Sequence, residues 1–307
     1  MRVGIINLLG KVPTRLNSHN AGWNYCIANY MQTDYNVYPE FINNIEEDLN
    51  NYDIICINNG VNYKENKFNF FGGVQQDTID KLIALSRYNN KLICYNEPVE
   101  FKHLLKRKEI SIIPNREVIK EYTYRNKMII GDSHSVSIFK KGYGILRLDG
   151  KTLHGFLKDP YSYIDFNKLN DVVLYFGNID IRFHLCRQKY TLASTKELVE
   201  KYIRFLSSLV NKGKIVKVQG LLPIEDESRK IPGTGLYKDK PFYGSQLERE
   251  DLRNRFNYFL ENSASKYGYD YQPPWLNYPL EFSKMEARQS VHISPENYLN
   301  KEFINAI

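Results

Sequence analysis

Short apolar runs that alternate with helix-like stretches are the feature that most constrains the fold of this 307-residue chain. Residues 3–9, 53–58 and 91–95 are apolar runs of a kind typical of strands buried on both faces of a sheet. Between them, residues 22–32 and 77–87 carry apolar side chains at helical spacing. Strands that alternate with helices form parallel sheets with right-handed crossovers. The first part of the chain is therefore predicted to be an α/β domain.

A second series of the same kind begins at Lys127. It contains predicted strands and long amphipathic helices, in the order 128–130, 171–176, 195–212, 215–222 and 247–267. The basic polar stretch 115–127, which follows a short predicted strand at 110–113, separates the two series. We expect two doubly wound parallel-sheet domains, one at 1–120 and one at 127–307.

Composition excludes several classes of protein. The apolar and charged fractions, 42% and 25%, are those of a globular chain. No apolar run reaches the roughly 20 residues that cross a bilayer, and no small-residue cleavage site follows the N-terminal run, so we expect a cytoplasmic protein without a membrane partner. The four cysteines lack CxxC spacing and the six histidines are scattered. Neither a metal site nor a cofactor is expected.

Positive charge is concentrated in one segment. Residues 102–151 hold twelve Lys and Arg against five Asp and Glu, so they carry the whole formal charge of +7 and the remainder is neutral overall. A basic belt of this kind suits a polyanion such as double-stranded DNA, because neutralised phosphates release counterions. A solvated, lysine-rich surface is the competing interpretation.

Three short motifs suggest chemistry in the second domain. Gly131-Asp132-Ser133-His134 and Gly177-Asn178-Ile179-Asp180 each follow a predicted strand, and His292 lies near the C-terminus. Because the carboxyl ends of parallel strands meet at one edge of the sheet, these residues are expected to lie together. Serine becomes a nucleophile when a base takes its proton and donors stabilise the oxyanion. We predict that Ser133 is the nucleophile and His292 its base.

The same motifs, in this order, resemble those of the SGNH (GDSL-type) hydrolase family over about residues 127–300. The resemblance implies a flavodoxin-like fold, with Asp132 and Ser133 in the nucleophile block. It implies an oxyanion-hole glycine at Gly150 or Gly155, and a third block at Gly177–Asp180.

Two positions depart from the family pattern. The oxyanion-hole asparagine falls on Ile179, so Asn178, Arg182 and His184 are the alternative donors. The aspartate that orients the histidine falls on Gln289, for which Glu286 is a substitute, unless the enzyme works as a dyad. Arg182 is expected either to clamp an anionic substrate or to pair with Asp180. The ring of His134 is expected to be a structural hydrogen-bonding group.

The first 100 residues show a separate resemblance, to the N-terminal domain of phage DNA β-glucosyltransferases. It rests on MRVGIINL at 1–8, NNYD at 50–53 and FNFFGG at 68–73, which includes Phe71, Gly72 and Gly73. In that family this domain contributes to the DNA-acceptor side of the cleft. The resemblance implies a catalytic-acid position at Glu97, after the KLICY strand, for which a loop or helix-capping carboxylate is the competing interpretation.

The leading hypothesis is a phage-type DNA-modification enzyme that transfers or hydrolyses an acyl-type group on a hydroxymethylated or decorated base through Ser133. Its partners are then DNA, bound by residues 102–151, and a small-molecule acyl donor. Three alternatives stay open. They are an esterase or acetyltransferase for carbohydrates or small esters without nucleic acid, a glycosyltransferase with an unusual donor domain, and a non-catalytic binding module.

Overall fold

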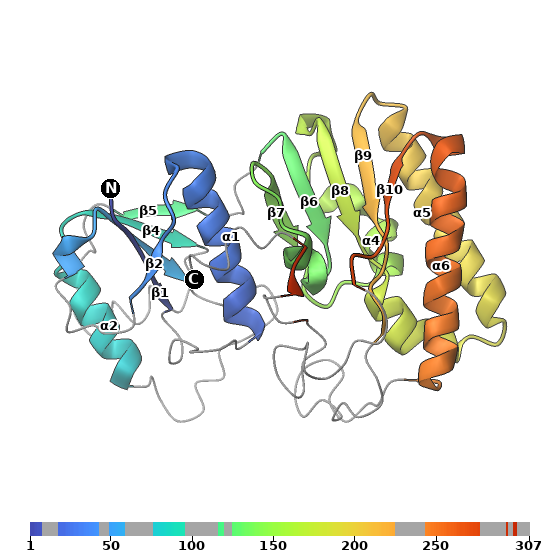
Figure 1. Ribbon diagram of the computed structural model, residues 1–307, viewed down its shortest axis with the longest axis horizontal. Coiled ribbons are helices and arrows are strands. Elements are labelled where there is room, and N and C mark those ends of the chain that lie inside the picture. Colours follow the sequence, from blue (N-terminus) through green and yellow to red (C-terminus); the bar gives the residue numbers. More distant parts are fainter. Residues whose placement is uncertain are drawn as a thin grey trace. The chain divides into compact units, whose positions relative to one another are not determined.

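The computed structural model describes residues 1–7, 18–42, 49–58, 76–95, 116–119, 125–224, 243–276, 293 and 297–299. The chain divides between Tyr124 and Arg125 into two compact units, and the second runs to Leu299 apart from Lys140–Gly142. Each unit contains a five-stranded sheet in which all strand pairs are parallel. The protein therefore has two parallel-sheet α/β domains, as predicted (Figure 1).

The first sheet has the strand order β2-β1-β3-β4-β5. Its elements follow in the order β1 (Val3–Asn7), α1 (Ser18–Tyr35), β2 (Glu40–Phe41), the 3-10 helix η1 (Leu49–Asn51), β3 (Ile54–Asn58), α2 (Gln76–Ser86), β4 (Lys91–Tyr95) and β5 (Arg116–Ile119). The order reverses between β1 and β3, which makes it a doubly wound arrangement of flavodoxin type.

The alternation of side chains along β3 shows why this sheet is buried on both faces. Ile54 and Cys56 pack with Ile27 and Met31 of α1. Residues 55 and 57 point the other way and join Leu85 of α2 in a separate apolar cluster. Figure 1 shows α1 and α2 on opposite sides of the sheet. The unbroken apolar run at 53–58 is thus explained by two helix layers.

One prediction about this domain needs correction. Residues 116–119 were placed in a polar stretch that separates the domains, but they form β5, paired in parallel with β4. The charged residues Arg116 and Glu117 interrupt the apolar pattern by which a strand is recognised. An edge strand tolerates such side chains. The strand predicted at 110–113 lies outside the described residues.

The second sheet has the order β10-β9-β8-β6-β7, which is 2-1-3-4-5 when its strands are counted from β6. This is the flavodoxin-like order. Its elements are β6 (Lys127–Gly131), the 3-10 helix η2 (Ser133–Ile138), β7 (Gly144–Arg147), α4 (Leu153–Lys158), the 3-10 helices η3 (Pro160–Ser162) and η4 (Phe166–Lys168), β8 (Asp171–Tyr175), the π-helix η5 (Asp180–His184), the 3-10 helix η6 (Leu185–Arg187), α5 (Thr191–Val210), β9 (Ile215–Gln219), α6 (Gln246–Tyr267) and β10 (Asp270–Gln272).

The central strands of this sheet are also buried on both faces. Every residue of β8 is buried, and so are residues 128–131 of β6. Aromatic side chains fill the layer under α4 and α5. Phe156 of α4 stacks on Phe176 with ring centroids 4.3 Å apart, and Phe205 of α5 meets Phe156 edge-to-face at 5.7 Å.

Sequence patterns did not identify β7, α4 or β10. Each is short, at three to six residues, and β7 and β10 lie at the two edges of the sheet. Elements of this length contain too few residues to show a period. The long helices were identified because α5 and α6 span 20 and 22 residues.

Candidate active site

The ends of β6 and β8 form the centre of the candidate site. The two strands are neighbours, and Gly131 at the end of β6 is in register with Tyr175 at the end of β8. The strand order reverses between them, because β7 follows on one side and β9 and β10 on the other. Ligands of open α/β sheets bind at the carboxyl ends of strands at such a switch point. Ser133 and Gly177–Asp180 follow these two strand ends directly.

Two glycines allow the strand ends to approach closely. A Cβ atom on Gly131 would lie 2.4 Å from the carbonyl oxygen of Tyr175, which no side chain permits. Gly177 has φ +122°, and a Cβ there would lie 2.9 Å from Phe256 of α6. Both positions therefore require glycine, for close approach at the first and also for backbone conformation at the second.

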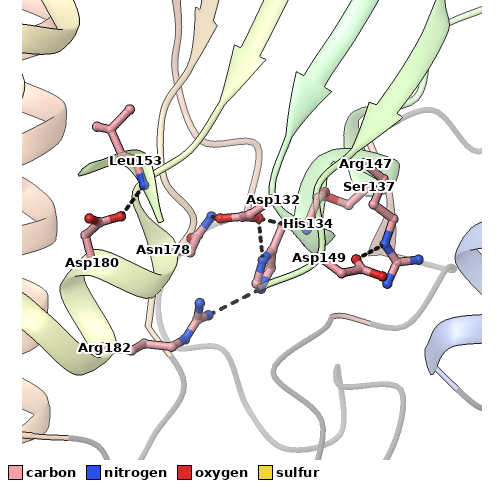
Figure 2. A network of polar contacts seen from close by, with 9 residues as sticks. All are labelled: Asp132, His134, Ser137, Arg147, Asp149, Leu153, Asn178, Asp180 and Arg182. Atoms are coloured by element: carbon pink, nitrogen blue, oxygen red, sulfur yellow. Dashed lines mark hydrogen bonds and ion pairs between the residues drawn. The ribbon is translucent and has the colours of Figure 1, made fainter. Parts of the chain in front are cut away.

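Asp132 is the hub of the polar network in Figure 2. Its side chain is completely buried, and its Oδ1 accepts hydrogen bonds from the backbone N–H and from Nδ1 of His134, both at 2.9 Å. Its Oδ2 accepts from the Nδ2 of Asn178 at 3.3 Å. A buried carboxylate needs such donors to offset its desolvation. The pair Asp132–Asn178 thus ties the end of β6 to the end of β8.

His134 is held from the other side by Arg182 of η5. The Nη2 of Arg182 lies 3.4 Å from the Nε2 of His134, and both side chains are buried. The ring of His134 therefore has a hydrogen-bonding role in the structure. No ion pair between Arg182 and Asp180 occurs among the described residues. The oxygens of Asp180 accept from two backbone N–H groups instead, at Leu153 and His154.

Ser133 is the first residue of η2 and lies between the two locked residues Asp132 and His134. It is 8% exposed, so it is nearly but not fully covered. All six residues of η2 are buried. The serine is therefore part of a rigid, packed turn rather than of an open loop.

Asp180 joins the β8 end to the start of α4. Its two carboxylate oxygens accept hydrogen bonds from the backbone N–H groups of Leu153 at 2.6 Å and His154 at 3.2 Å. Burial raises the pKa of Asp180 to about 7, and the charge of Asp132 adds to this, although the two N–H groups act in the opposite direction. The N–H of Gly155, predicted to bind an oxyanion, donates instead to the Oγ1 of Thr152 at 2.9 Å.

A cavity of about 340 Å³ lies between α4, the η5–η6 turn and the first half of α5, and we call it the α4–α5 cavity. Ser133 is not among its described lining residues, whereas Asp180 and His184 are. The lining is Thr152, His154, Asp180, His184, Leu185, Gln188, Ser194, Glu197, Leu198 and Lys201. Of these residues, the sequence analysis singled out Asp180 and His184. The others were missed, although Thr152 before α4 carries the signal of a helix cap.

Several predicted site residues lie outside the described residues. They are the base His292 with Gln289 and Glu286, and Glu97, Phe71, Gly72 and Gly73 of the first domain. The described residues on either side of the His292 segment contact the second domain near the candidate site. Trp275 meets Tyr175 edge-to-face with centroids 6.4 Å apart, and the N–H of Leu299 donates to the carbonyl of Ser137 in η2 at 2.9 Å.

Within the described residues, no cluster of three or more His, Cys, Asp and Glu side chains has the geometry to hold a metal ion. The described helices include none with the length and apolarity that a membrane span requires.

No family model matches the chain, and no curated protein matches it. Solved structures resemble part of it. A putative platelet activating factor from Streptococcus pneumoniae is 16% identical with a TM-score of 0.41, over 57% of this chain and 79% of that one. A putative acylhydrolase from Bacteroides fragilis is 16% identical with a TM-score of 0.38, over 56% and 79%. A carbohydrate acetylesterase from Sinorhizobium meliloti is 12% identical with a TM-score of 0.37, over 59% and 96%.

These similarities are partial and distant, so the function proposed below rests on the residues of the site. The predicted resemblance of residues 1–100 to DNA glucosyltransferases has no support in the comparisons, and it stays a prediction. The DNA partner also stays a prediction, because residues 102–115 and 120–124 of the basic segment lie outside the described residues.

Proposed function

We propose that this protein is a serine-dependent ester hydrolase or acyltransferase with Ser133 as its nucleophile. The observation that carries the proposal is the position of Ser133. It follows the central strand β6 at the switch point of a flavodoxin-like sheet, between two residues whose side chains are locked to each other. Rigid placement of a nucleophile lowers the entropic part of a reaction barrier.

The proposed reaction has two steps. The Ser133 oxygen attacks the carbonyl carbon of an ester, and its proton passes to the imidazole of His292. The carbon–oxygen bond to the alcohol then breaks, and the alcohol leaves with that proton. Water attacks the acyl-serine in the second step, which releases the acid and restores Ser133. An acceptor alcohol in place of water gives acyl transfer.

The assignment of the base to His292 is supported by the contacts that flank its segment. Trp275 packs on Tyr175 at the end of β8, and Leu299 bonds to η2. The other imidazole close to the nucleophile, that of His134, has both ring nitrogens engaged by Asp132 and Arg182. His134 is therefore unsuited to take a proton from Ser133.

Asn178 is the proposed oxyanion donor. Its amide carries two N–H bonds, and Asp132 accepts only one of them. Ile179, at the position of the family asparagine, has an apolar, buried side chain and donates nothing. One N–H of the Asn178 amide thus fixes the side chain to Asp132. The position of Asn178 after the end of β8 places the amide near the Ser133 turn, where it is proposed to donate to the oxyanion.

The α4–α5 cavity is the proposed site for the alcohol part of the ester. Gln188 and Ser194 supply groups that both donate and accept hydrogen bonds, and Leu185 and Leu198 supply an apolar wall. The ring of His154 makes no hydrogen bond within the part of the chain that the structure describes. The charged Glu197 and Lys201 also line the cavity and pair with each other at 2.6 Å. Such a lining suits a hydroxylated alcohol and favours the carbohydrate or small-ester alternative over the DNA hypothesis.

DNA as the acceptor is a second candidate, favoured only by the charge of +7 in residues 102–151. It predicts that the protein binds hydroxymethylated duplex DNA at low salt and releases it steeply as salt rises. Acyl transfer to that DNA by the wild type, absent in Ser133→Ala, would support it. Failure to bind at low salt would leave the small-ester function alone.

Hydrolysis of 4-nitrophenyl acetate tests the proposed function. We expect Ser133→Ala to lower kcat/KM by about 10⁴-fold or more. The matched control is Ser135→Ala, two residues along η2. The hydroxyl of Ser135 is buried and makes no hydrogen bond within the described residues, so its removal is expected to leave folding and turnover nearly unchanged. Equal rates for Ser133→Ala and the wild type would overturn the proposal.

A further inference from the structure

The contact between Arg182 and His134 has a consequence for the protonation of the imidazole. We propose that Arg182 is a positioning residue that selects the Nδ1–H tautomer of His134 and thereby holds the Ser133 turn. The effect on turnover rests on the proposed function, whereas the tautomer does not. Arg182 lies on η5, after β8, so a side chain from one strand end acts on the turn at the neighbouring strand end (Figure 2).

The tautomer of His134 depends on which neighbouring groups donate a hydrogen bond and which accept one. A guanidinium has N–H donors and no acceptor, so at 3.4 Å from Nη2 the Nε2 of His134 is the acceptor and carries no hydrogen. A neutral imidazole has one N–H, which is then on Nδ1. The Nδ1 lies 2.9 Å from the Oδ1 of Asp132, which is a carboxylate acceptor. All three groups are satisfied by this tautomer.

The other two protonation states of the His134 ring are incompatible with one or both of its contacts to Asp132 and Arg182. An Nε2–H tautomer puts two donors face to face at Arg182 and two lone pairs face to face at Asp132. A doubly protonated ring keeps the bond to Asp132 but brings two buried cations together at Arg182. Of the three ring states, only the Nδ1–H form makes both contacts.

The described charged or titratable groups that face the ring come from three elements. Asp132 caps η2, Arg182 belongs to η5, and Tyr175 of β8 meets the ring edge-to-face with centroids 6.4 Å apart. Burial raises the pKa of Tyr175, so its phenol stays neutral near pH 7. The two charged contacts, one acceptor and one donor, therefore set the tautomer.

The tautomer matters for Ser133 because the serine lies between the two bonded residues. Asp132 accepts from both the backbone N–H and the ring of His134, which closes a small hydrogen-bonded ring around the Ser133 backbone. Without the hydrogen bond from Nδ1 of His134 to Asp132, only the hydrogen bond from the backbone N–H of His134 holds the turn. A small displacement of a nucleophile is enough to slow a reaction by one to two orders of magnitude.

The alternative role for Arg182, a clamp for an anionic substrate, fits its surroundings less well. Its side chain is 2% exposed and its Nη2 is directed at the imidazole. Its contact with His134 places it beside the nucleophile turn and not on a reacting atom, so we class it as a positioning residue and not as a catalytic one.

Nitrogen-15 NMR of the imidazoles in the full chain tests the tautomer directly. We expect His134, identified by the signal missing from His134→Gln, to show a protonated Nδ1 and an unprotonated Nε2 at pH 7.5. Arg182→Lys is expected to preserve this pattern, because lysine also donates. Arg182→Met is expected to lose it. A wild-type ring with protonated Nε2, or with both nitrogens protonated, would overturn the proposal whether or not the variants fold.

Steady-state kinetics with 4-nitrophenyl acetate then separate positioning from simple destabilisation. We expect Arg182→Met to lower kcat by about 10-fold to 100-fold with little change in KM, and Arg182→Lys to recover most of the loss. The matched control is Arg187→Met in η6, an exposed arginine over the ring of Tyr243, which is expected to change neither kcat nor the spectrum. An unchanged kcat in a folded Arg182→Met with an altered tautomer would refute the positioning role.

The two failures are distinguishable. If the wild type has no esterase activity but shows the expected tautomer, the proposed function fails and the assignment of Arg182 to His134 stands. If activity depends on Ser133 but the tautomer is wrong, the reverse holds.

Discussion

The two sheets of this protein have the same strand order, but the described buried polar side chains lie on different parts of the two units. Each reads 2-1-3-4-5 within its own unit. In the described part of the first unit, the buried polar side chains are Asn24, Gln32 and Lys81, all on helices. In the second unit the described buried polar residues are more numerous, and six of them lie directly after the ends of β6 and β8, namely Asp132, Ser133, His134, Asn178, Asp180 and Arg182.

In the second unit, the carboxyl ends of the strands supply a place for a site, and the buried polar groups there mark where it is built. Burying a carboxylate such as Asp132 or Asp180 costs free energy unless donors surround it. The second unit meets that cost with the amide of Asn178 and with backbone N–H groups of α4 and η2. Apolar residues fill a buried layer at lower cost, so this polar arrangement points to a use beyond packing.

The largest effect that sharpens this comparison is expected from the base. We expect His292→Ala to lower kcat/KM for 4-nitrophenyl acetate by about 10⁴-fold. His19→Ala, which removes an imidazole from α1 of the first unit, is the control and is expected to stay within a few-fold of the wild type. A full rate in His292→Ala would assign the proton transfer to another group.

The next effect concerns the close approach of β6 and β8. Gly131→Ala places a methyl group 2.4 Å from a backbone carbonyl that cannot move away, so we expect a loss of about 4 kcal/mol or more in the free energy of unfolding. Gly150→Ala is the control. Its φ is +70° and an added Cβ meets nothing within 4 Å, so only the backbone strain of about 1 kcal/mol is expected. Urea titration followed by circular dichroism measures both, and equal losses would contradict the packing argument.

A core substitution in the first sheet tests whether that unit is separate from the chemistry. Ile55 is fully buried in β3, so Ile55→Ala is expected to destabilise the first unit by about 3 kcal/mol. Below the unfolding temperature of that unit, turnover at Ser133 is expected to be unchanged. Calorimetry and the esterase assay on one sample give both values. A parallel fall in activity at low temperature would show that the first sheet shapes the site.

The smallest effect is a pH dependence that belongs to Asp180. Its pKa is about 7 in the folded chain against an ordinary value of 3.8, so the folded state binds the proton more tightly than the unfolded state. The contribution of Asp180 to the free energy of unfolding is therefore fully present below about pH 4 and is lost as the pH rises toward 7. We expect the wild type to lose about 2 to 3 kcal/mol between pH 5 and 7 relative to Asp180→Asn. Parallel stability curves for the two proteins over that range would refute the assignment.

The sequence predicted the central parts of both domains and less of the periphery. Runs such as KLICY, now β4, carry enough apolar residues to be recognised alone. β5 escaped because Arg116 and Glu117 mask it, and α4 because six residues show no clear period. The positions of Ser133 and Gly177 after strand ends were predictable from local sequence. The link from Arg182 to His134 was not, because it spans 48 residues and depends on a π-helix after β8.

The most direct test of the central claim is covalent labelling of the full chain with a fluorophosphonate, followed by peptide mapping. We expect one modified residue, Ser133, with labelling abolished in Ser133→Ala, strongly slowed in His292→Ala and retained in Ser135→Ala. Absence of labelling in the folded wild type, or modification of a different serine, would contradict it.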